Sequence, residues 1–146
     1  MLIVFLKVEL IYLDTNIYLA YLENRTDNLR PLGEFALRLI QRTLGCEFKI
    51  IISGLVVNEV ERHVNVERLK EVIRSLKETE KLIRVGITSE DEIRAKELTK
   101  TRDTHFDDAL HAVLAQRAKA KFLITRNIND FADLQDLVDI RLPESI

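Results

Sequence analysis

The sequence predicts an α/β fold, a three-layer α/β/α arrangement in which helices cover both faces of a central, mostly parallel sheet of four to five strands. Short apolar runs recur along the chain, and amphipathic segments of helical length separate them. Strands that alternate with helices pair in parallel through right-handed crossovers. A length of 146 residues and a hydrophobic fraction of 47% suit one domain over residues 1–146.

Apolar runs of strand length predict the members of the sheet. Four are clear, a fifth near the end of the sequence is weaker, and the segment Ile3–Val8 either extends the first strand or adds an edge strand. The four clear candidates are Leu10–Leu13, Lys49–Ile52, Leu82–Val85 and Lys121–Ile124, and the fifth is Leu137–Ile140.

Helical periodicity predicts the elements between the strands. Leu32–Leu44 carries apolar residues on one side, and the segment from Val66 to Leu76 has an apolar stripe opposite Lys and Glu residues. The spacing of a capping box predicts two further helix starts. These starts are Ser89 with Glu92, and Thr104 with Asp107.

Composition limits the compartment and the class of partner. The formal charge is −2, so no overall basic excess marks the chain as a nucleic-acid binder, although a local metal cluster can still attract phosphate. Cys46 is the only cysteine, which excludes an internal disulfide and a thiolate metal site. The apolar start lacks the basic leader and the cleavage site of a signal peptide, and no other run approaches the roughly 20 apolar residues of a membrane span. We therefore expect a cytoplasmic protein without membrane association.

Acidic residues follow the first two strands, at the edge where parallel α/β sheets bind ligands. Asp14 comes directly after the first strand. Taken alone, it is more typical of an N-cap for the next helix than of a binding site. Glu59 borders the apolar face of a helix expected to begin near Gly54. Its alternative role is that of a partly exposed acid that benefits from the helix dipole.

Two more acids lie in the second half of the chain. If Asp107 is a capping-box acid, Asp108 has no structural role and is expected to point inward at the top of its helix. His111 is expected to be a packed or rim histidine, because no second His or Cys stands at metal-ligand spacing. Asp130 lies in a segment typical of a turn, and Phe131 is expected to anchor that segment in the core.

Four carboxylates at one edge of a sheet repel one another. Some of their pKa values must then rise above the reference of about 4, unless protons or cations intervene. A divalent ion removes the conflict, and oxygen ligands favour Mg²⁺ or Mn²⁺ over Zn²⁺. Because Mg²⁺ takes one or two carboxylates directly and keeps several waters, we do not expect all four acids to touch the metal.

These motifs resemble the PIN-domain family over nearly the whole chain, with VapC-like ribonucleases as the nearest type. The matching pieces are Leu-Asp-Thr-Asn at 13–16, Ser53 with Glu59, Asp-Ala-Leu-His-Ala at 108–112, and Thr-Arg-Asn at 125–127 followed by Asp130. The resemblance implies a Mg²⁺- or Mn²⁺-dependent nuclease that hydrolyses RNA phosphodiester bonds.

The resemblance also implies roles for individual residues. Asp14 and Asp108 are the first choice for direct metal ligands. Glu59 and Asp130 are expected to bind directly, through water, or to a second ion. A shift of one position would exchange Asp108 with Asp107. The implied catalytic acids are Asp14, Glu59, Asp108 and Asp130, and the implied hydrogen-bonding groups around them are Thr15, Asn16, Ser53, Thr125 and Asn127.

Partners are implied in the same way. Many small proteins of this type are toxins that an antitoxin protein holds inactive and that pair as homodimers, while other relatives process RNA or act in RNA surveillance. Two different functions stay open. One is a PIN-like module that binds RNA or protein without cutting. The other is a phosphoryl-transfer domain with Asp14 as nucleophile, although Asn16 stands where such an enzyme is expected to carry a second acid.

Overall fold

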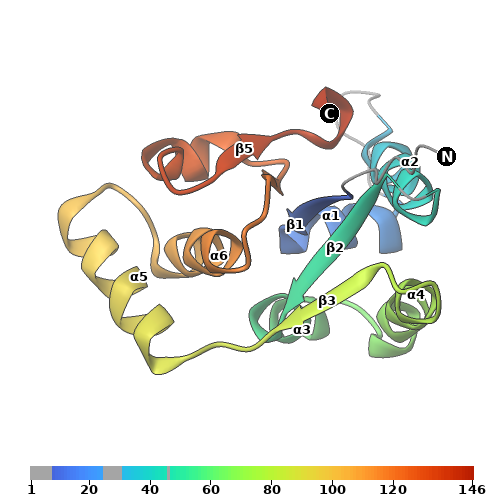
Figure 1. The fold of residues 1–146 in the computed structure, drawn as a ribbon, viewed down its shortest axis with the longest axis horizontal. Coiled ribbons are helices and arrows are strands. Elements are labelled where there is room, and N and C mark those ends of the chain that lie inside the picture. The colour runs from blue at the N-terminus through green and yellow to red at the C-terminus, as the bar shows by residue number, and fades with distance from the viewer. Residues whose placement is uncertain (1–7, 25–30, 46) are drawn as a thin grey trace, which may run out of the picture.

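A computed structural model describes residues 8–24, 31–45 and 47–146. A sheet of five strands forms its centre, in the order β3-β2-β1-β4-β5, and every pairing is parallel (Figure 1). This confirms the expected α/β class. The strands are β1 (Glu9–Leu13), β2 (Phe48–Ser53), β3 (Leu82–Val85), β4 (Phe122–Ile124) and β5 (Asp139–Arg141).

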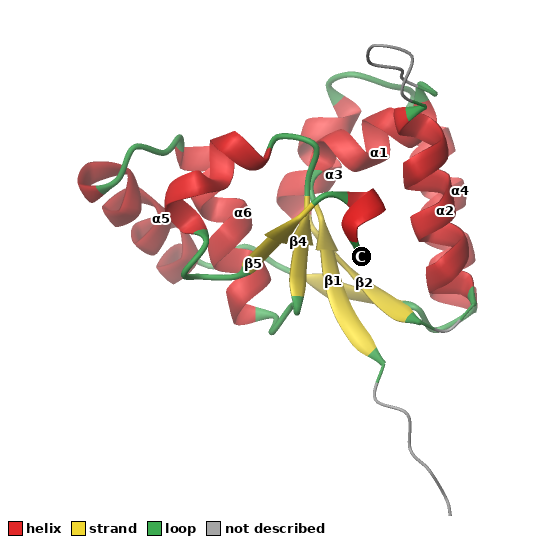
Figure 2. Cartoon of the chain, turned by 90° about the horizontal axis from the view of Figure 1, so that it is seen from above, coloured by secondary structure: helices red, strands yellow, loops and turns green. Residues whose placement is uncertain are grey.

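The helices form two layers, one on each face of the sheet. Their bounds are α1 (Thr15–Leu22), α2 (Leu32–Leu44), α3 (Gly54–Glu61), α4 (Val66–Glu78), α5 (Ser89–Thr101) and α6 (Phe106–Arg117), with short 3₁₀ helices η1 (Ile128–Leu134) and η2 (Pro143–Ser145). The chain crosses the sheet in one direction from β1 to β3 and returns in the other direction from β3 to β5. Right-handed crossovers in opposite directions place their helices on opposite faces. Accordingly α1 to α4 pack together, and α5 and α6 form the other layer with η1 (Figure 2).

Burial on both faces explains why the strands are continuously apolar rather than alternating. Ile11, Tyr12 and Leu13 of β1 and Ile50 and Ile51 of β2 have no exposed surface. A parallel sheet covered by helices on both sides requires this pattern. Among the described residues, no helix is long and apolar enough to cross a membrane.

The strand ends differ slightly from the sequence prediction. The expected extension Ile3–Val8 lies outside the described residues except for Val8, which precedes β1. The weak fifth strand begins two residues later than predicted and ends at Arg141. Leu137 and Val138 are buried, but they belong to the turn after η1, so their apolar character reflects packing rather than strand pairing.

The predicted start of α5 is wrong by one residue. Thr88 caps the helix in place of Ser89, because its hydroxyl accepts from the N–H of Asp91 (3.2 Å) and the Asp91 carboxylate accepts from the N–H of Thr88 (2.8 Å). Two overlapping capping-box patterns begin one residue apart in this segment. Burial of Asp91 against Arg117 selects the first of them.

The predicted capping box of α6 does not form. His105 is the N-cap, and its side chain makes no capping hydrogen bond. The hydroxyl of Thr104 points to the carbonyl of His105 (3.4 Å), and Asp107 is exposed. The physical reason is the preceding turn, in which the N–H of Thr104 donates to the carbonyl of Arg102 (3.0 Å) and leaves Thr104 outside the helix start.

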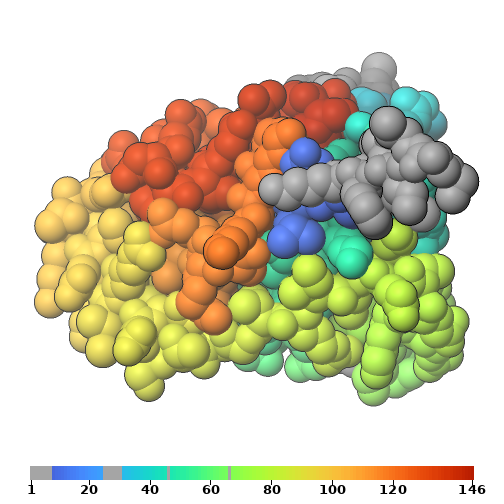
Figure 3. Space-filling view, in the orientation of Figure 1, coloured from blue at the N-terminus to red at the C-terminus, as the bar shows by residue number. Residues whose placement is uncertain are grey.

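A surface ion pair ties the turn between α5 and α6 to η1. The Arg102 guanidinium donates to both carboxylate oxygens of Asp136 (2.6 and 3.0 Å) and to the carbonyl of Asp133 (2.8 Å). The N–H of Asp103 donates to the Asp133 carboxylate (3.2 Å). Figure 3 shows these two segments in contact on one face of the molecule. The elements that carry Asp108 and Asp130 are thereby fastened together.

The Asp91 carboxylate joins the two helices of the second layer. Arg117 donates to both of its oxygens (2.9 Å each). Burial raises the pKa of Asp91, but the hydrogen bonds from Arg117 and Thr88 outweigh burial, so the pKa lies below the ordinary value of 3.8. A carboxylate with a depressed pKa in the folded state contributes stability above its unfolded pKa and loses it as the pH falls through the folded pKa.

We therefore predict that Asp91→Asn lowers the free energy of unfolding at neutral pH by about 2 kcal/mol, the usual scale for a hydrogen bond to a charged group. The difference from the wild type should shrink below about pH 4, where the wild-type carboxylate takes up a proton. Urea unfolding over a pH series measures both effects. Asp139→Asn is the control, because its pair with Arg141 is exposed. A difference that does not change with pH would contradict this assignment.

Candidate functional site

The connections that leave β1 and β4 run across the sheet in opposite directions, toward β2 and β5 respectively. The strand order therefore reverses between these two neighbouring strands. In open parallel sheets, the crevice at this point is where ligands bind. Asp14 follows β1 and Thr125 follows β4, and the N–H of Asp14 donates to the carbonyl of Ile124 (2.9 Å). Ser53 ends the neighbouring strand β2. The carboxyl ends of three adjacent strands thus bring polar side chains to one edge.

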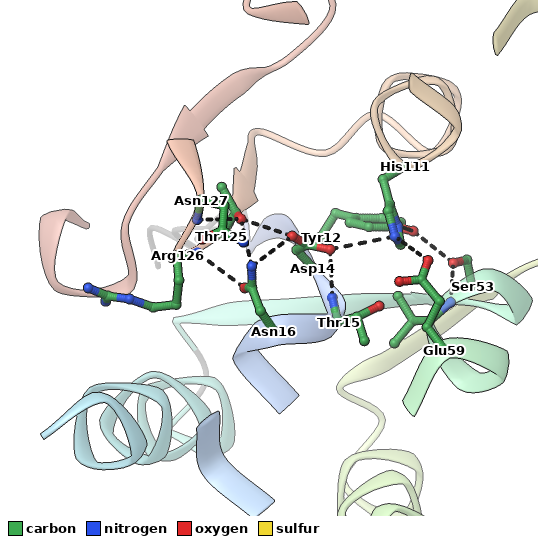
Figure 4. Close-up of polar contacts among 11 residues, drawn as sticks. Tyr12, Asp14, Thr15, Asn16, Ser53, Glu59, His111, Thr125, Arg126 and Asn127 are labelled. Carbon is green, nitrogen blue, oxygen red and sulfur yellow. Dashed lines mark hydrogen bonds and ion pairs between the residues drawn. The ribbon is translucent and has the colours of Figure 1, made fainter. Parts of the chain in front are cut away.

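Asp14 is buried, and both of its carboxylate oxygens are hydrogen-bonded (Figure 4). Oδ1 accepts from the N–H of Thr15 (2.7 Å), and Oδ2 accepts from the hydroxyl of Thr125 (2.9 Å) and the amide of Asn16 (3.1 Å). Burial raises the pKa of Asp14 above 3.8, although nearby His111 and these donors act in the opposite direction. Asp14 is also the N-cap of α1, so capping and a place at the sheet edge are compatible.

The loop after β4 is locked onto the first turn of α1. The Asn16 amide donates to the hydroxyl of Thr125 (3.2 Å), and its oxygen accepts from the N–H of Arg126 (3.1 Å). The same Thr125 hydroxyl accepts from the N–H of Asn127 (3.0 Å). Asn16 and Thr125 therefore contact the Asp14 carboxylate directly, whereas Asn127 supports it through its backbone.

Glu59 reaches the same edge from α3 and meets His111 of α6. Nε2 of His111 lies 2.8 Å from Oε1 of Glu59 and 3.5 Å from Oδ1 of Asp14. Burial raises the pKa of Glu59, but the hydrogen bond and charge of His111 outweigh it and the net pKa is lowered. Burial lowers the pKa of His111, but Glu59, Asp14 and Asp108 outweigh it and the net pKa is raised. His111 is 1% exposed, as expected for a packed histidine.

Tyr12 is a contributor that the sequence analysis missed. Its hydroxyl lies 2.7 Å from both Oγ of Ser53 and Nδ1 of His111. Ser53 is one of the hydrogen-bonding groups that the family resemblance implies around the acids; its hydroxyl contacts Tyr12 and accepts from the N–H of Val56 (3.3 Å). The available signal was a tyrosine in an otherwise aliphatic buried strand, because a buried tyrosine hydroxyl usually needs a partner.

Asp108 and Asp130 occupy the open side of the site. Asp108 is half-buried in the first turn of α6, and Asp130 is exposed in η1. Within the described ranges, neither carboxylate accepts a hydrogen bond or forms an ion pair. Burial, followed by the negative charges of Asp14 and Asp130, raises the pKa of Asp108 to about 6. This places Asp14, Asp108 and Asp130 in one electrostatic field, whereas Asp107 points to solvent.

The donors at this edge suit a hard cation. The carboxylates supply oxygen ligands, and both nitrogens of His111 are already engaged. The Thr15 hydroxyl is buried and lies close enough to Glu59 to lower its pKa, yet it has no hydrogen bond of normal geometry to any described residue. A water bound to a cation would satisfy such a group. As the described side chains lie, no three of the acids, His or Cys converge tightly enough to hold an ion alone. A bound Mg²⁺ would therefore keep several waters, as this ion usually does.

The fold and the site together define the class of protein. It is an α/β domain with acidic residues at the switch point of a parallel sheet. The PIN domain family matches residues 11–137, and the chain belongs to this family. A search of the curated proteins finds no match.

Solved structures share the fold at low sequence identity. A toxin-antitoxin complex from Klebsiella pneumoniae is 20% identical, with a TM-score of 0.62, and the match covers 90% of this chain and 96% of that one. VapBC2 from Rickettsia felis, bound to a DNA fragment from its promoter, is 18% identical with a TM-score of 0.61, over 90% and 96% of the two chains. VapC20 from Mycobacterium tuberculosis, a sarcin-ricin loop cleaving toxin, is 18% identical with a TM-score of 0.52, over 77% and 86%.

Mutual repulsion among the acids leads us to predict a raised pKa for Asp108 in the metal-free protein. Asp108 should titrate near pH 6, and Asp130→Asn should move its pKa toward 3.8 by removing a negative charge that raises it. Carbon-13 NMR of the carboxyl groups in the presence of a chelator measures the shift. Asp139→Asn, which removes an exposed acid paired with Arg141 on β5, is the control and should leave Asp108 unchanged. An Asp108 that titrates near the reference of about 4 would contradict the clustering.

Proposed function

We propose that the protein is a Mg²⁺- or Mn²⁺-dependent ribonuclease that hydrolyses RNA phosphodiester bonds. The observation that carries this proposal is the geometry of the sheet edge, where the buried Asp14 carboxylate and the Glu59 carboxylate lie 3.5 and 2.8 Å from the same atom, Nε2 of His111. The pKa of Asp108, raised to about 6 by burial and by the charges of Asp14 and Asp130, supports it. Carboxylates held together in a partly buried site destabilise one another, and a divalent cation offsets that repulsion. The same acids repel a phosphodiester, so a bound cation is also what would let RNA approach.

Each acid has a distinct role in this proposal. Asp14 and Asp108 would hold the ion, with Asp14 kept in place by Thr125 and Asn16. Glu59 and Asp130 would contact the ion or its waters. A bound ion would polarise the phosphate and lower the pKa of an attacking water. Exposed Asp130 and half-buried Asp108 leave that side of the site open to solvent, which gives the RNA backbone access.

We further propose that the chain is the toxin of a toxin-antitoxin pair and forms a homodimer. The toxin role is supported by the similar structures, which include a toxin-antitoxin complex and a toxin that cleaves the sarcin-ricin loop, whereas the homodimer follows only from the family resemblance. Growth of a bacterium that expresses the chain alone tests the toxin role. Arrest by the wild type but not by Asp108→Asn supports it. Active cleavage of RNA without any effect on growth would favour an RNA-processing nuclease instead.

Asp108→Asn should lower the rate of RNA cleavage by more than about 100-fold. The reason is that mutation of a residue that only supports a metal ligand already lowers metal affinity or activity by about 10–100-fold. Asp107→Asn is the matched control, since it makes the same change one residue earlier on an exposed side chain, and should cleave at the wild-type rate. Labelled RNA incubated with Mn²⁺, with Mg²⁺ or with a chelator gives the measurement. Cleavage that survives the chelator would sink the metal mechanism, and a wild type that binds RNA without cutting would favour a binding module.

A further inference from the structure

A buried chain of hydrogen bonds leads from the start of α3 to the acidic site (Figure 4). The Ser53 hydroxyl accepts from the N–H of Val56 (3.3 Å) and lies 2.7 Å from the hydroxyl of Tyr12. The Tyr12 hydroxyl lies 2.7 Å from Nδ1 of His111, and Nε2 of that ring lies 2.8 Å from Glu59. Ser53, Tyr12 and His111 are each at most 1% exposed, so water does not compete for the hydrogen bonds among these three side chains.

The Glu59 carboxylate fixes the direction in which these hydrogen bonds are donated. An ionised carboxylate only accepts, so Nε2 of His111 must donate to Glu59. In the neutral ring, Nδ1 then accepts from the hydroxyl of Tyr12, whose oxygen accepts from Ser53. In the protonated ring, Nδ1 donates to Tyr12, which donates to Ser53. Nε2–H points to Glu59 in both cases. With the neutral ring, every donor of the three buried side chains has an acceptor, whereas with the protonated ring the Ser53 hydroxyl proton has no acceptor among the described residues, which favours the neutral ring.

The chain of hydrogen bonds begins and ends on the same helix, α3. Ser53 caps α3, and Glu59 lies on its second turn, while the two links between them come from β1 and α6. This closed arrangement fixes the rotation of a Glu side chain that would otherwise sample several rotamers. It also places Oδ1 of Asp14 3.5 Å from the Nε2 atom that donates to Glu59, so the two carboxylates lie beside the same ring nitrogen.

We propose that Tyr12, Ser53 and His111 form a positioning relay that holds the Glu59 carboxylate beside Asp14 in the orientation that a divalent cation requires. The relay rests on the proposed function, since it acts on the cation only through these two acids. Hydrogen-bond partners of metal ligands commonly tune affinity in this way. If the network served only to stabilise the core, loss of the Tyr12 hydroxyl would lower stability and leave Mn²⁺ binding unchanged.

Two buried tyrosines provide a matched pair of variants. Tyr12→Phe and Tyr18→Phe each remove one hydroxyl from a ring that is at most 1% exposed, but the Tyr18 hydroxyl has no hydrogen-bond partner in the part of the chain described. Isothermal titration calorimetry with Mn²⁺ should show about tenfold weaker binding for Tyr12→Phe. Tyr18→Phe should bind as the wild type does. Unchanged affinity in folded Tyr12→Phe overturns the relay.

Two substitutions at His111 test the same relay if Tyr12→Phe does not fold. His111→Gln keeps a side-chain N–H donor for Glu59, whereas His111→Leu removes it. The Gln variant should retain more of the Mn²⁺ affinity than the Leu variant, and equal affinities would overturn the relay.

In cleavage assays, high Mn²⁺ should restore the rate of Tyr12→Phe, because the loss lies in metal binding. A rate reduced by the same factor at every Mn²⁺ concentration would also overturn the relay.

Failure of the relay can be distinguished from failure of the proposed function. A wild-type protein that binds no Mn²⁺ in the calorimeter contradicts both. A wild-type protein that binds Mn²⁺ and cleaves RNA, beside a Tyr12→Phe variant that does the same with equal affinity, contradicts the relay alone.

Discussion

Parallel pairing of the strands is the constraint on which the site depends. In an all-parallel sheet every strand ends at the same edge, so residues that follow the strands meet there however far apart they lie in the sequence. The hydroxyl of Thr125 and the carboxylate of Asp14 are separated by 111 positions and yet form a hydrogen bond of 2.9 Å. Reversal of the strand order at β1 and β4 leaves no helix between these two ends. The carboxylate therefore stays at the edge of the sheet, where 10% of the Asp14 side chain is exposed.

Burial of that carboxylate then shapes its surroundings. A charged group removed from water is costly unless donors surround it, and Asp14 receives hydrogen bonds from a backbone N–H, a hydroxyl and an amide. All three donors belong to the first turn of α1 or to the loop after β4. The folding of these two segments and the placement of the acid therefore depend on each other. Nε2 of His111 approaches the same carboxylate to 3.5 Å from the opposite layer of helices. The two layers thus meet at the site through polar contacts, while elsewhere the apolar sheet separates them.

Local patterns in the sequence predict the elements, but not the contacts between them. Leu32–Leu44 and Leu82–Val85 have the predicted bounds, because amphipathic periodicity and a bounded apolar run are properties of neighbouring residues. The cap of α5 is shifted because two overlapping patterns compete, and only the tertiary pairing of Asp91 with Arg117 decides between them. Tyr12 and His111 lie 99 positions apart, so no local pattern indicates that their side chains meet. Placement of acids after strands could be predicted; whether those acids bind a metal together stays a prediction.

The clamp of Arg102 on Asp136 has a consequence for how the two halves of the site respond to salt. Asp14 and His111 are buried and Glu59 is partly buried, so salt screens the charges among them less than it screens a surface pair. The clamp that fastens η1, which carries Asp130, is exposed, with 31% and 63% of the two side chains accessible. Counter-ions weaken such a pair as the Debye length shortens to about 8 Å at physiological ionic strength. Added salt therefore weakens the clamp more than it weakens the contacts around Asp14, while Phe131 and Leu134, which are fully buried, keep η1 on the core.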